Sequence, residues 1–248
     1  MIITLLTDFG IADSYVAEMK GVLLSRAPQA TLVDVSHQVP VGDIRAGQYV
    51  LSRTWHQFPR GTVHLAVVDP GVGTERRALV AESAGHRFLA PDNGLLSFLP
   101  ADARFFALPI PSQAAPTFHG RDLFAPAAAA LSLGEPVESL GTAVTDSVRA
   151  PLPIPRGEGG TIIGEVIYID HFGTLISNIP ATALKPDPRI RVGGSDAGPL
   201  RRTFTDVPPG ALVAFIGSGG TVEIAVRDGS AAAMLNIGVE AEVRVQNT

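Results

Sequence analysis

The sequence predicts an α/β protein with a mostly parallel, layered α/β domain over residues 1–150 and a small β-barrel-like domain over residues 161–248. In the first part, short apolar runs alternate with amphipathic stretches at the spacing of strand–helix–strand units, which is typical of parallel sheets. In the second part, short strand-like runs separated by turns are typical of a barrel. Three prolines and three glycines in residues 150–160 disfavour helix and strand and predict a linker over residues 151–160.

The first domain is predicted to begin with strands and helices in alternation. Three apolar runs, each long enough for a buried strand, lie at residues 2–6, 31–35 and 63–68. Val16, Met19 and Leu23 form a helical stripe between the first two runs. We expect Asp13 to cap that helix and Asp43 to cap the next one. Because a helix separates each pair of strands, the strands are expected to pair in parallel.

After the third run, the pattern changes to that of a hairpin. Residues 78–82 and 87–90 are expected to pair around a turn at Ala84-Gly85. A short helix is predicted around residues 95–99. A Pro-rich loop then leads to an Ala-rich helix near the end of the domain.

The second domain is predicted to contain mainly strands. Five strand-like runs lie at residues 161–170, 189–192, 211–216, 221–226 and 241–245. Only residues 230–235 have a helical pattern. The glycine-rich residues 217–220 resemble a dinucleotide-binding loop, but the run that follows them has the pattern of a strand, so a hairpin turn is predicted.

Polar side chains follow the predicted strands of the first domain at the points where the strands end. Asp8, His37 and Asp69 come after the three apolar runs, and Asn93 and His119 lie in later loops. The carboxyl ends of parallel strands share one edge of the sheet, which is where open α/β sheets bind ligands. We therefore expect these five side chains to gather at that edge.

The stretch after the third run is the strongest candidate for a site. Asp69 opens an Asp-Pro-Gly turn that must leave the sheet sharply, because proline restricts φ and glycine permits positive φ. Arg76 and Arg77 follow in the same glycine-containing loop. This stretch alone leaves two interpretations open: a ligand site, or an ordinary turn with a solvated aspartate and two surface arginines.

The composition excludes several classes of protein and site. The net charge of −5 argues against nonspecific binding of nucleic acid. The absence of cysteine excludes disulfides, thiolate nucleophiles and cysteine–zinc sites. No apolar run approaches the ~20 residues of a membrane span, and the first residues lack a secretory signal, so a cytoplasmic enzyme is expected. The histidines have no metal-binding spacing, and no metal site is predicted.

Six motifs occur in order along nearly the whole chain. They are Leu6-Thr7-Asp8-Phe9-Gly10, Asp34-Val35-Ser36-His37, Asp69-Pro70-Gly71-Val72-Gly73-Thr74, Ala90-Pro91-Asp92-Asn93-Gly94, Thr117-Phe118-His119-Gly120-Arg121-Asp122 and Ile169-Asp170-His171-Phe172-Gly173. Together they resemble the S-adenosyl-L-methionine (SAM) hydroxide adenosyltransferases, which are relatives of the fluorinase and the chlorinase. Six ordered motifs across both predicted domains make a chance resemblance very improbable.

The resemblance implies an enzyme that hydrolyses SAM to adenosine and L-methionine, with SAM as the substrate and no cofactor. Activated water, or hydroxide, attacks C5′ of the adenosyl group. The catalytic trio of the family falls on Asp69, Arg76 and His119. The substrate-binding positions are expected at Asp8, Asp13, Asn93, Gly120, Asp170, Phe172, Asn178 and Ser218. Asp8 is expected to accept hydrogen bonds from both ribose hydroxyls.

The chemistry assigns a role to each residue of the trio. His119 is expected to accept the proton of the water, Arg76 to stabilise hydroxide-like charge, and Asp69 to orient the arginine and the water. Two alternatives remain. The first is a non-catalytic protein that binds an adenosyl ligand, in which Asp69 and Arg76 only brace the loop. The second is a SAM-dependent halogenase. Halogenases of this superfamily lack the trio and have a halide-binding serine near Gly120, which disfavours the last alternative.

The resemblance also implies an assembly. It predicts a homotrimer in which each site combines the N-terminal domain of one chain with the C-terminal domain of its neighbour. This chain departs from the family pattern at Val41 and Gly42, where an aromatic residue usually follows the proline, and at Arg227, which replaces the usual asparagine. These departures concern the adenine end of the site and leave the trio intact.

Overall fold

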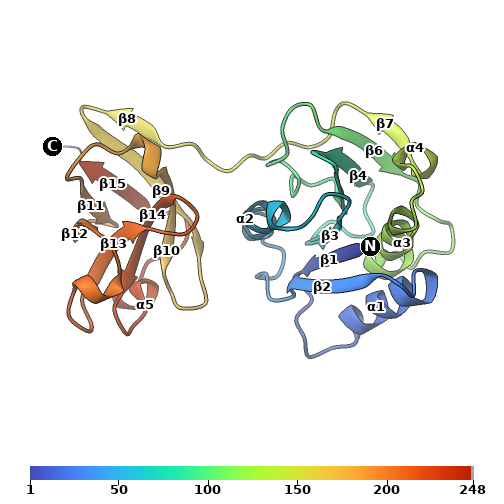
Figure 1. Cartoon of the computed structure of the whole chain (residues 1–248), viewed down its shortest axis with the longest axis horizontal. Coiled ribbons are helices and arrows are strands. Elements are labelled where there is room, and N and C mark those ends of the chain that lie inside the picture. The colour runs from blue at the N-terminus through green and yellow to red at the C-terminus, as the bar shows by residue number, and fades with distance from the viewer. Residues whose placement is uncertain (247–248) are drawn as a thin grey trace. The chain divides into compact units, whose positions relative to one another are not determined.

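The computed structural model describes residues 1–246, and the chain divides into two compact units (Figure 1). The first unit spans Met1–Pro151, and the second begins at Leu152. Residues 247 and 248, which end the predicted second domain, lie outside the described residues. No helix within residues 1–246 combines the length and apolar character that a membrane crossing requires.

The first unit is built on a seven-stranded sheet in the order β2-β1-β3-β5-β4-β6-β7. Its strands are β1 (Ile2–Thr7), β2 (Thr31–Ser36), β3 (Val63–Val67), β4 (Ala78–Ser83), β5 (His86–Pro91), β6 (Arg104–Leu108) and β7 (Thr142–Val144). β1 pairs in parallel with β2 and β3, and β3 pairs in parallel with β5. The remaining pairings are antiparallel, including the predicted hairpin of β4 and β5. Half of the sheet is therefore parallel, and the parallel half contains β1, β2, β3 and β5.

Helices cover both faces of this sheet (Figure 1). They are α1 (Tyr15–Arg26), α2 (Ile44–Thr54), α3 (Ala125–Ser132) and α4 (Val137–Leu140), with the 3₁₀ turn η1 (Trp55–Gln57) and the π-helical turn η2 (Gly120–Phe124). Successive side chains of a strand point to opposite faces. Ile3 and Leu5 of β1 therefore share one buried core with Met19 and Leu23 of α1, and α3 contributes to the same core. This arrangement places both helices on one face of the sheet.

The second unit is a β-barrel, as predicted. Its strands are β8 (Arg156–Glu158), β9 (Thr161–Ile169), β10 (Leu175–Pro180), β11 (Arg189–Val192), β12 (Ser195–Arg201), β13 (Leu212–Ile216), β14 (Thr221–Val226) and β15 (Glu242–Gln246), and its helical segments are η3 (Ala181–Ala183), η4 (Phe204–Asp206) and α5 (Ala231–Leu235). The strand order is β10-β14-β13-β12-β11-β15-β9-β8. Because β10 also pairs with β9, seven strands close into a ring, and β8 pairs with β9 beside it. The predicted fold class is confirmed.

The two predicted helix caps had different outcomes. Asp43 caps α2, where its Oδ1 accepts a hydrogen bond from the Ala46 amide at 2.9 Å. The cap predicted at Asp13 is wrong, because α1 begins one residue later and Ser14 occupies the cap position. The Ser14 hydroxyl donates to the Glu18 carboxylate at 2.7 Å and makes no hydrogen bond that caps the helix.

Two local predictions are also wrong. Residues 95–99 form turns and no helix, because Oδ1 of Asn93 accepts from the Leu95 amide and Pro100 lacks the N–H group that a continuing helix needs. The predicted linker contains a strand, since β8 pairs with the start of β9. Strands β6, β7, β10 and β12 were not predicted. β6, β7 and β10 pair with distant segments, which local periodicity does not report, whereas β12 forms a tight hairpin with β11 that the sequence analysis missed.

Candidate active site

The carboxyl ends of β1, β2, β3 and β5 share one edge of the first unit's sheet, because these strands run in parallel. Asp8 directly follows β1, His37 follows β2, and Asp69 lies two residues beyond β3. Asn93 lies two residues beyond β5, and its amide Nδ2 donates to the carbonyl oxygen of Val68 at 2.8 Å. The sequence prediction that polar groups gather at this edge is confirmed for these residues.

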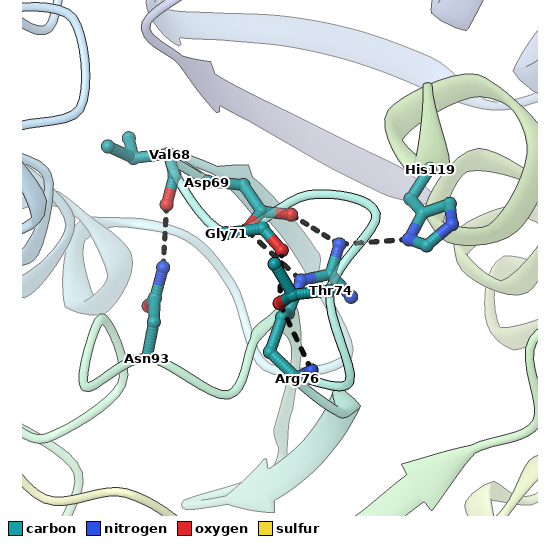
Figure 2. A network of polar contacts seen from close by, with 7 residues as sticks. All are labelled: Val68, Asp69, Gly71, Thr74, Arg76, Asn93 and His119. Carbon is teal, nitrogen blue, oxygen red and sulfur yellow. Dashed lines mark hydrogen bonds and ion pairs between the residues drawn. The ribbon is translucent and has the colours of Figure 1, made fainter. Parts of the chain in front are cut away.

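Asp69 and Arg76 form a buried ion pair at this edge (Figure 2). Nε of Arg76 donates to Oδ1 of Asp69 at 3.0 Å, and Nη2 donates to Oδ2. The side chain of Arg76 is only 9% exposed, and that of Asp69 is only 4% exposed. This two-point contact fixes the plane of the guanidinium as well as its distance, which a single ammonium group does not do.

The loop that carries this pair, residues 69–76, is folded on itself and against a second segment. We call it the Asp69 loop. The Thr74 hydroxyl donates to the Gly71 carbonyl oxygen at 2.7 Å and accepts from the Arg76 amide at 3.3 Å. Gly73 has a φ of +80°, and a Cβ added there would lie 2.9 Å from the Pro116 carbonyl oxygen. Glycine therefore permits the loop to approach the segment that leads to His119.

His119 completes the group at the start of η2 (Figure 2). Its Nδ1 lies 2.9 Å from Nη2 of Arg76. The arginine always donates, so Nδ1 accepts, and in the neutral ring the proton is on Nε2. Burial lowers the pKa of His119, and the positive charge of Arg76 lowers it further. The imidazole is therefore held in its neutral form with a defined tautomer.

Arg76 has one donor group that is not used within this network. Its Nη1 is buried and has no hydrogen-bond partner among residues 1–246. A buried donor without a partner is costly, so such groups are commonly associated with a functional site. The guanidinium also lies over the Phe124 ring, with 5.7 Å between its central carbon and the ring centroid. The site thus presents a fixed positive group in partly apolar surroundings.

Asp8 lies next to both parts of this network. Its Oδ2 accepts from the Gly42 amide at 2.8 Å, and Gly42 lies against Pro70 of the Asp69 loop. The adjoining Phe9 ring packs edge-on against Phe118, with the centroids 6.0 Å apart. The structure therefore places the Asp8 segment beside the segments of Asp69 and His119.

The other substrate-binding positions expected in the first unit differ in their surroundings. Gly120 is buried, and a Cβ added there would lie 3.1 Å from Met19 Sδ and 3.4 Å from the Phe9 ring. Both polar atoms of the Asn93 side chain bond to backbone: Nδ2 donates to the Val68 carbonyl oxygen, and Oδ1 accepts from the Leu95 amide. Asp13 is exposed in the turn before α1.

The barrel contains the remaining expected positions. Asp170 and Phe172 line a pocket of about 540 Å³, and Phe172 is 75% exposed. Oδ1 of Asp170 accepts from the amides of Phe172 and Thr174, which shapes the turn between β9 and β10. Asn178 instead bridges the Glu165 amide and a backbone carbonyl of the preceding linker. Ser218 is exposed in the turn between β13 and β14, which is the predicted hairpin turn.

Several residues of these sites were not predicted. Thr7 is the last residue of β1 and bonds to His37, and its signal was a hydroxyl at the end of a mainly apolar strand. Phe204 and Glu223 line the barrel pocket. Neither has a local signal, because the pocket forms only where η4, β14 and the turn after β9 pack together. Within residues 1–246, no three histidine or carboxylate side chains are grouped in a way that could hold a metal ion.

Comparisons with known proteins agree with this architecture. Residues 3–141 match the family model described as the SAM hydroxide adenosyltransferase N-terminal domain, and residues 164–244 match the model of the C-terminal domain. A protein from Thermus thermophilus named (R)-S-adenosyl-L-methionine hydrolase is 44% identical, over 94% of this chain and 94% of its own length. A fluorinase from Nocardia brasiliensis is 31% identical, over 98% of this chain and 97% of its own length.

A solved structure supports the same relationship. An uncharacterized conserved protein from Thermotoga maritima has a TM-score of 0.90 and 33% sequence identity with this chain, and the match covers 100% of both chains. Both family models together span most of the sequence, and the structural match extends over both units. The chain belongs to the SAM hydroxide adenosyltransferase family.

Proposed function

We propose that this protein hydrolyses SAM to adenosine and L-methionine by attack of water at C5′ of the adenosyl group. The observation that carries the proposal is the buried group in which Arg76 bonds to both Asp69 and His119. The name of the Thermus thermophilus relative, a SAM hydrolase, supports the same substrate and reaction. The fluorinase is a more distant relative at 31% identity.

The reaction requires a better nucleophile and no help for the leaving group. An oxygen of water forms a bond to C5′ while the bond between C5′ and sulfur breaks. The electron pair of that bond goes to sulfur, so methionine leaves as a neutral thioether, and the water loses one proton. Because positive charge on the substrate disappears as the new bond forms, a site sheltered from water favours the transition state.

The residues of the network divide this work. Arg76 stabilises negative charge on the attacking oxygen through Nη1, the donor without a protein partner. Asp69 holds the guanidinium in place. His119 accepts the proton at Nδ1, its only unprotonated ring nitrogen, as the water replaces Nη2 of Arg76 at that atom. This chemistry uses side chains alone, so we propose that the reaction requires neither a cofactor nor a metal.

The substrate is larger than the edge of one sheet. Asp8 binds the ribose, and the barrel pocket of Asp170 and Phe172 supplies an apolar wall with a carboxylate. We propose a homotrimer in which the first unit of one chain and the barrel of its neighbour form each site. The cytoplasm, where SAM is made and used, is the proposed compartment.

The identity of the products tests the proposal. The protein is incubated with SAM and chloride in water enriched in oxygen-18, and the products are separated and weighed by mass spectrometry. We expect adenosine and methionine in equal amounts, with oxygen-18 in adenosine. An Arg76→Leu chain is the matched control and is expected to give only the background of spontaneous breakdown.

The same experiment distinguishes the alternatives. A halogenase yields 5′-chloro-5′-deoxyadenosine, and a binding protein yields no product although calorimetry detects adenosyl binding. The packing of Gly120 argues against the halogenase, because a side chain at this position meets Met19 and Phe9 at close range. Either outcome contradicts the proposed hydrolysis.

A further inference from the structure

We propose that His37 is a positioning residue for Asp8, and that Thr7, His37 and Asp34 form a relay that places the Asp8 carboxylate for adenosyl binding. The inference rests on the role proposed above for Asp8 in binding the ribose. Its basis is a set of contacts between His37 and residues 7–10, which we call the Asp8 loop.

His37 holds the Asp8 loop on both sides of Asp8. Its Nδ1 lies 2.9 Å from the Thr7 hydroxyl, and both side chains are buried. Its backbone carbonyl oxygen accepts from the Gly10 amide at 2.7 Å. One histidine, 30 residues away from Thr7 in the sequence, therefore anchors both ends of the loop.

The hydrogen-bond donors determine the direction of the relay. Nε2 of His37 lies 3.1 Å from Oδ1 of Asp34, off the ideal hydrogen-bond line, and this carboxylate can only accept, so in the neutral ring the proton is on Nε2. Nδ1 then accepts from the Thr7 hydroxyl, whose oxygen also accepts from the Phe9 amide at 3.3 Å. Lys20 holds the other carboxylate oxygen of Asp34 at 2.6 Å. Asp34 and Lys20 thus support the ring that orients Thr7.

A second threonine–histidine pair in β1 shows what a purely structural contact looks like. The Thr4 hydroxyl lies 2.8 Å from Nδ1 of His64, and both side chains are buried. Thr4 lies within β1, three residues before its end, and does not belong to the Asp8 loop. Loss of the Thr4 contact is therefore expected to affect stability alone, whereas loss of the Thr7 contact affects adenosyl binding as well.

Isosteric substitutions test this difference. Thr7→Val removes the hydroxyl and keeps the shape, Thr7→Ser keeps the hydroxyl, and Thr4→Val is the matched control. We measure the Kd for adenosine by calorimetry, together with KM and kcat for SAM. Thr7→Val is expected to raise Kd and KM about tenfold with kcat within about twofold of wild type. Thr7→Ser and Thr4→Val are expected to bind adenosine as the wild type does.

A double-mutant cycle tests whether the relay acts through Asp8. In a chain that already carries Asp8→Ala, adding Thr7→Val is expected to change the Kd by less than about twofold. Asp34→Ala, which changes a partly exposed side chain, provides a second variant in case Thr7→Val does not fold. It is expected to weaken adenosine binding about threefold, because it removes one support of the ring.

The outcomes separate the two proposals. The relay is wrong if Thr7→Val, or Asp34→Ala where Thr7→Val is unfolded, binds adenosine with wild-type affinity. It is also wrong if Thr7→Val weakens binding equally with and without Asp8. If Asp8→Ala itself leaves the Kd unchanged, the binding role of Asp8 fails and the relay fails with it. If wild type binds adenosine but forms none from SAM, only the proposed hydrolysis fails.

Discussion

Arg76 joins the other two residues of the candidate trio, so a single substitution there tests the whole group. Lysine preserves the charge but cannot reproduce the two-point contact with Asp69 and the bond to His119. Arg76→Lys is expected to lower kcat about 100-fold or more, with little change in the Kd for adenosine. An assay that follows adenosine formation over time measures kcat, and calorimetry measures the Kd for adenosine.

An arginine outside the site provides the control for this substitution. Arg104 also bonds to two carboxylates, Glu82 and Glu138, but its side chain is 55% exposed. Arg104→Lys is expected to retain wild-type kcat. A loss of affinity without a loss of kcat in Arg76→Lys would remove Arg76 from the chemical step.

The dependence of kcat on pH at acidic values tests the role of His119. Burial and Arg76 lower the pKa of this imidazole below its ordinary value of 6.5. The ring is therefore neutral at and above neutral pH, and protonation on acidification removes the acceptor at Nδ1. We expect kcat to be constant near neutrality and to fall only at acidic pH. His119→Gln is expected to be slow with no such fall, and a wild-type profile without a fall in acid would contradict the assignment.

At the scale of elements, the approach of two loops positions the trio. Gly73 allows the Asp69 loop to reach the Pro116 carbonyl, and an alanine there combines backbone strain with a clash. Gly210 of the barrel has nearly the same φ, +78°, but an added Cβ meets nothing within 4 Å. Backbone strain is expected to cost each alanine variant about 1 kcal/mol of unfolding free energy, and Gly73→Ala is expected to lose more because of the clash. Only Gly73→Ala is expected to lower kcat, by about tenfold or more, because the clash displaces Arg76 from its position relative to His119 and the attacking water.

Equal kcat values in the two glycine variants would show that the contact with Pro116 does not position the site. Urea unfolding measures the stability of each variant, and the assay with SAM measures kcat. Because the backbone strain is matched, the difference between the two variants reports the clash alone.

The packing of β1, β3 and β5 makes stability depend on pH. His64 of β3 is fully buried between the Thr4 hydroxyl and His86. Burial, and then the neighbouring His86, lower the pKa of His64 to about 3. The unfolded chain binds this proton near pH 6.5 and the folded chain does not, so this contribution to stability is complete above about pH 6.5 and declines as the pH falls toward 3.

His64 is expected to contribute a slope of about 0.7 kcal/mol of unfolding free energy per pH unit at pH 6.5, which rises to about 1.3 kcal/mol per pH unit at pH 5. Urea unfolding at these two pH values measures it, and most carboxylates stay ionised across this window. His64→Gln is expected to be less stable at neutral pH and to have a shallower slope. An unchanged slope in this variant would assign the pH dependence to other groups.

At the scale of the molecule, complementation tests the proposed sharing of sites. A chain with Asp69→Asn and a chain with Asp170→Ala are each expected to be inactive alone. The two chains are unfolded together and refolded as a mixture. If neighbouring chains form each site, about one quarter of the interfaces combine two intact halves, and activity returns to that fraction of wild type. If each site lies within one chain, every site keeps one lesion and the mixture stays inactive. Refolding each variant alone is the control.

The sequence by itself determined the features that depend on short-range geometry. The positions of β1, β2 and β3, each to within one residue at its C-terminal end, follow from side-chain periodicity. The Asp43 cap follows from a capping carboxylate, and the turn at Ala84-Gly85 follows from a glycine that permits positive φ. Parallel pairing of strands then places Asp8 and Asp69 at one edge without further information. These features need no knowledge of distant residues.

Only the tertiary structure decided which groups touch. The bond from Arg76 to His119 joins residues 43 apart, and its direction defines the tautomer of the imidazole. Packing between segments also determines two further hydrogen bonds. One joins Thr7 to His37, and the other runs from the Asn93 side-chain amide to the Val68 carbonyl oxygen. Hydrogen bonds act over about 3 Å, and periodicity in the sequence does not position side chains to that accuracy. The packed core fixes these distances, because its close packing leaves each buried side chain little freedom to move.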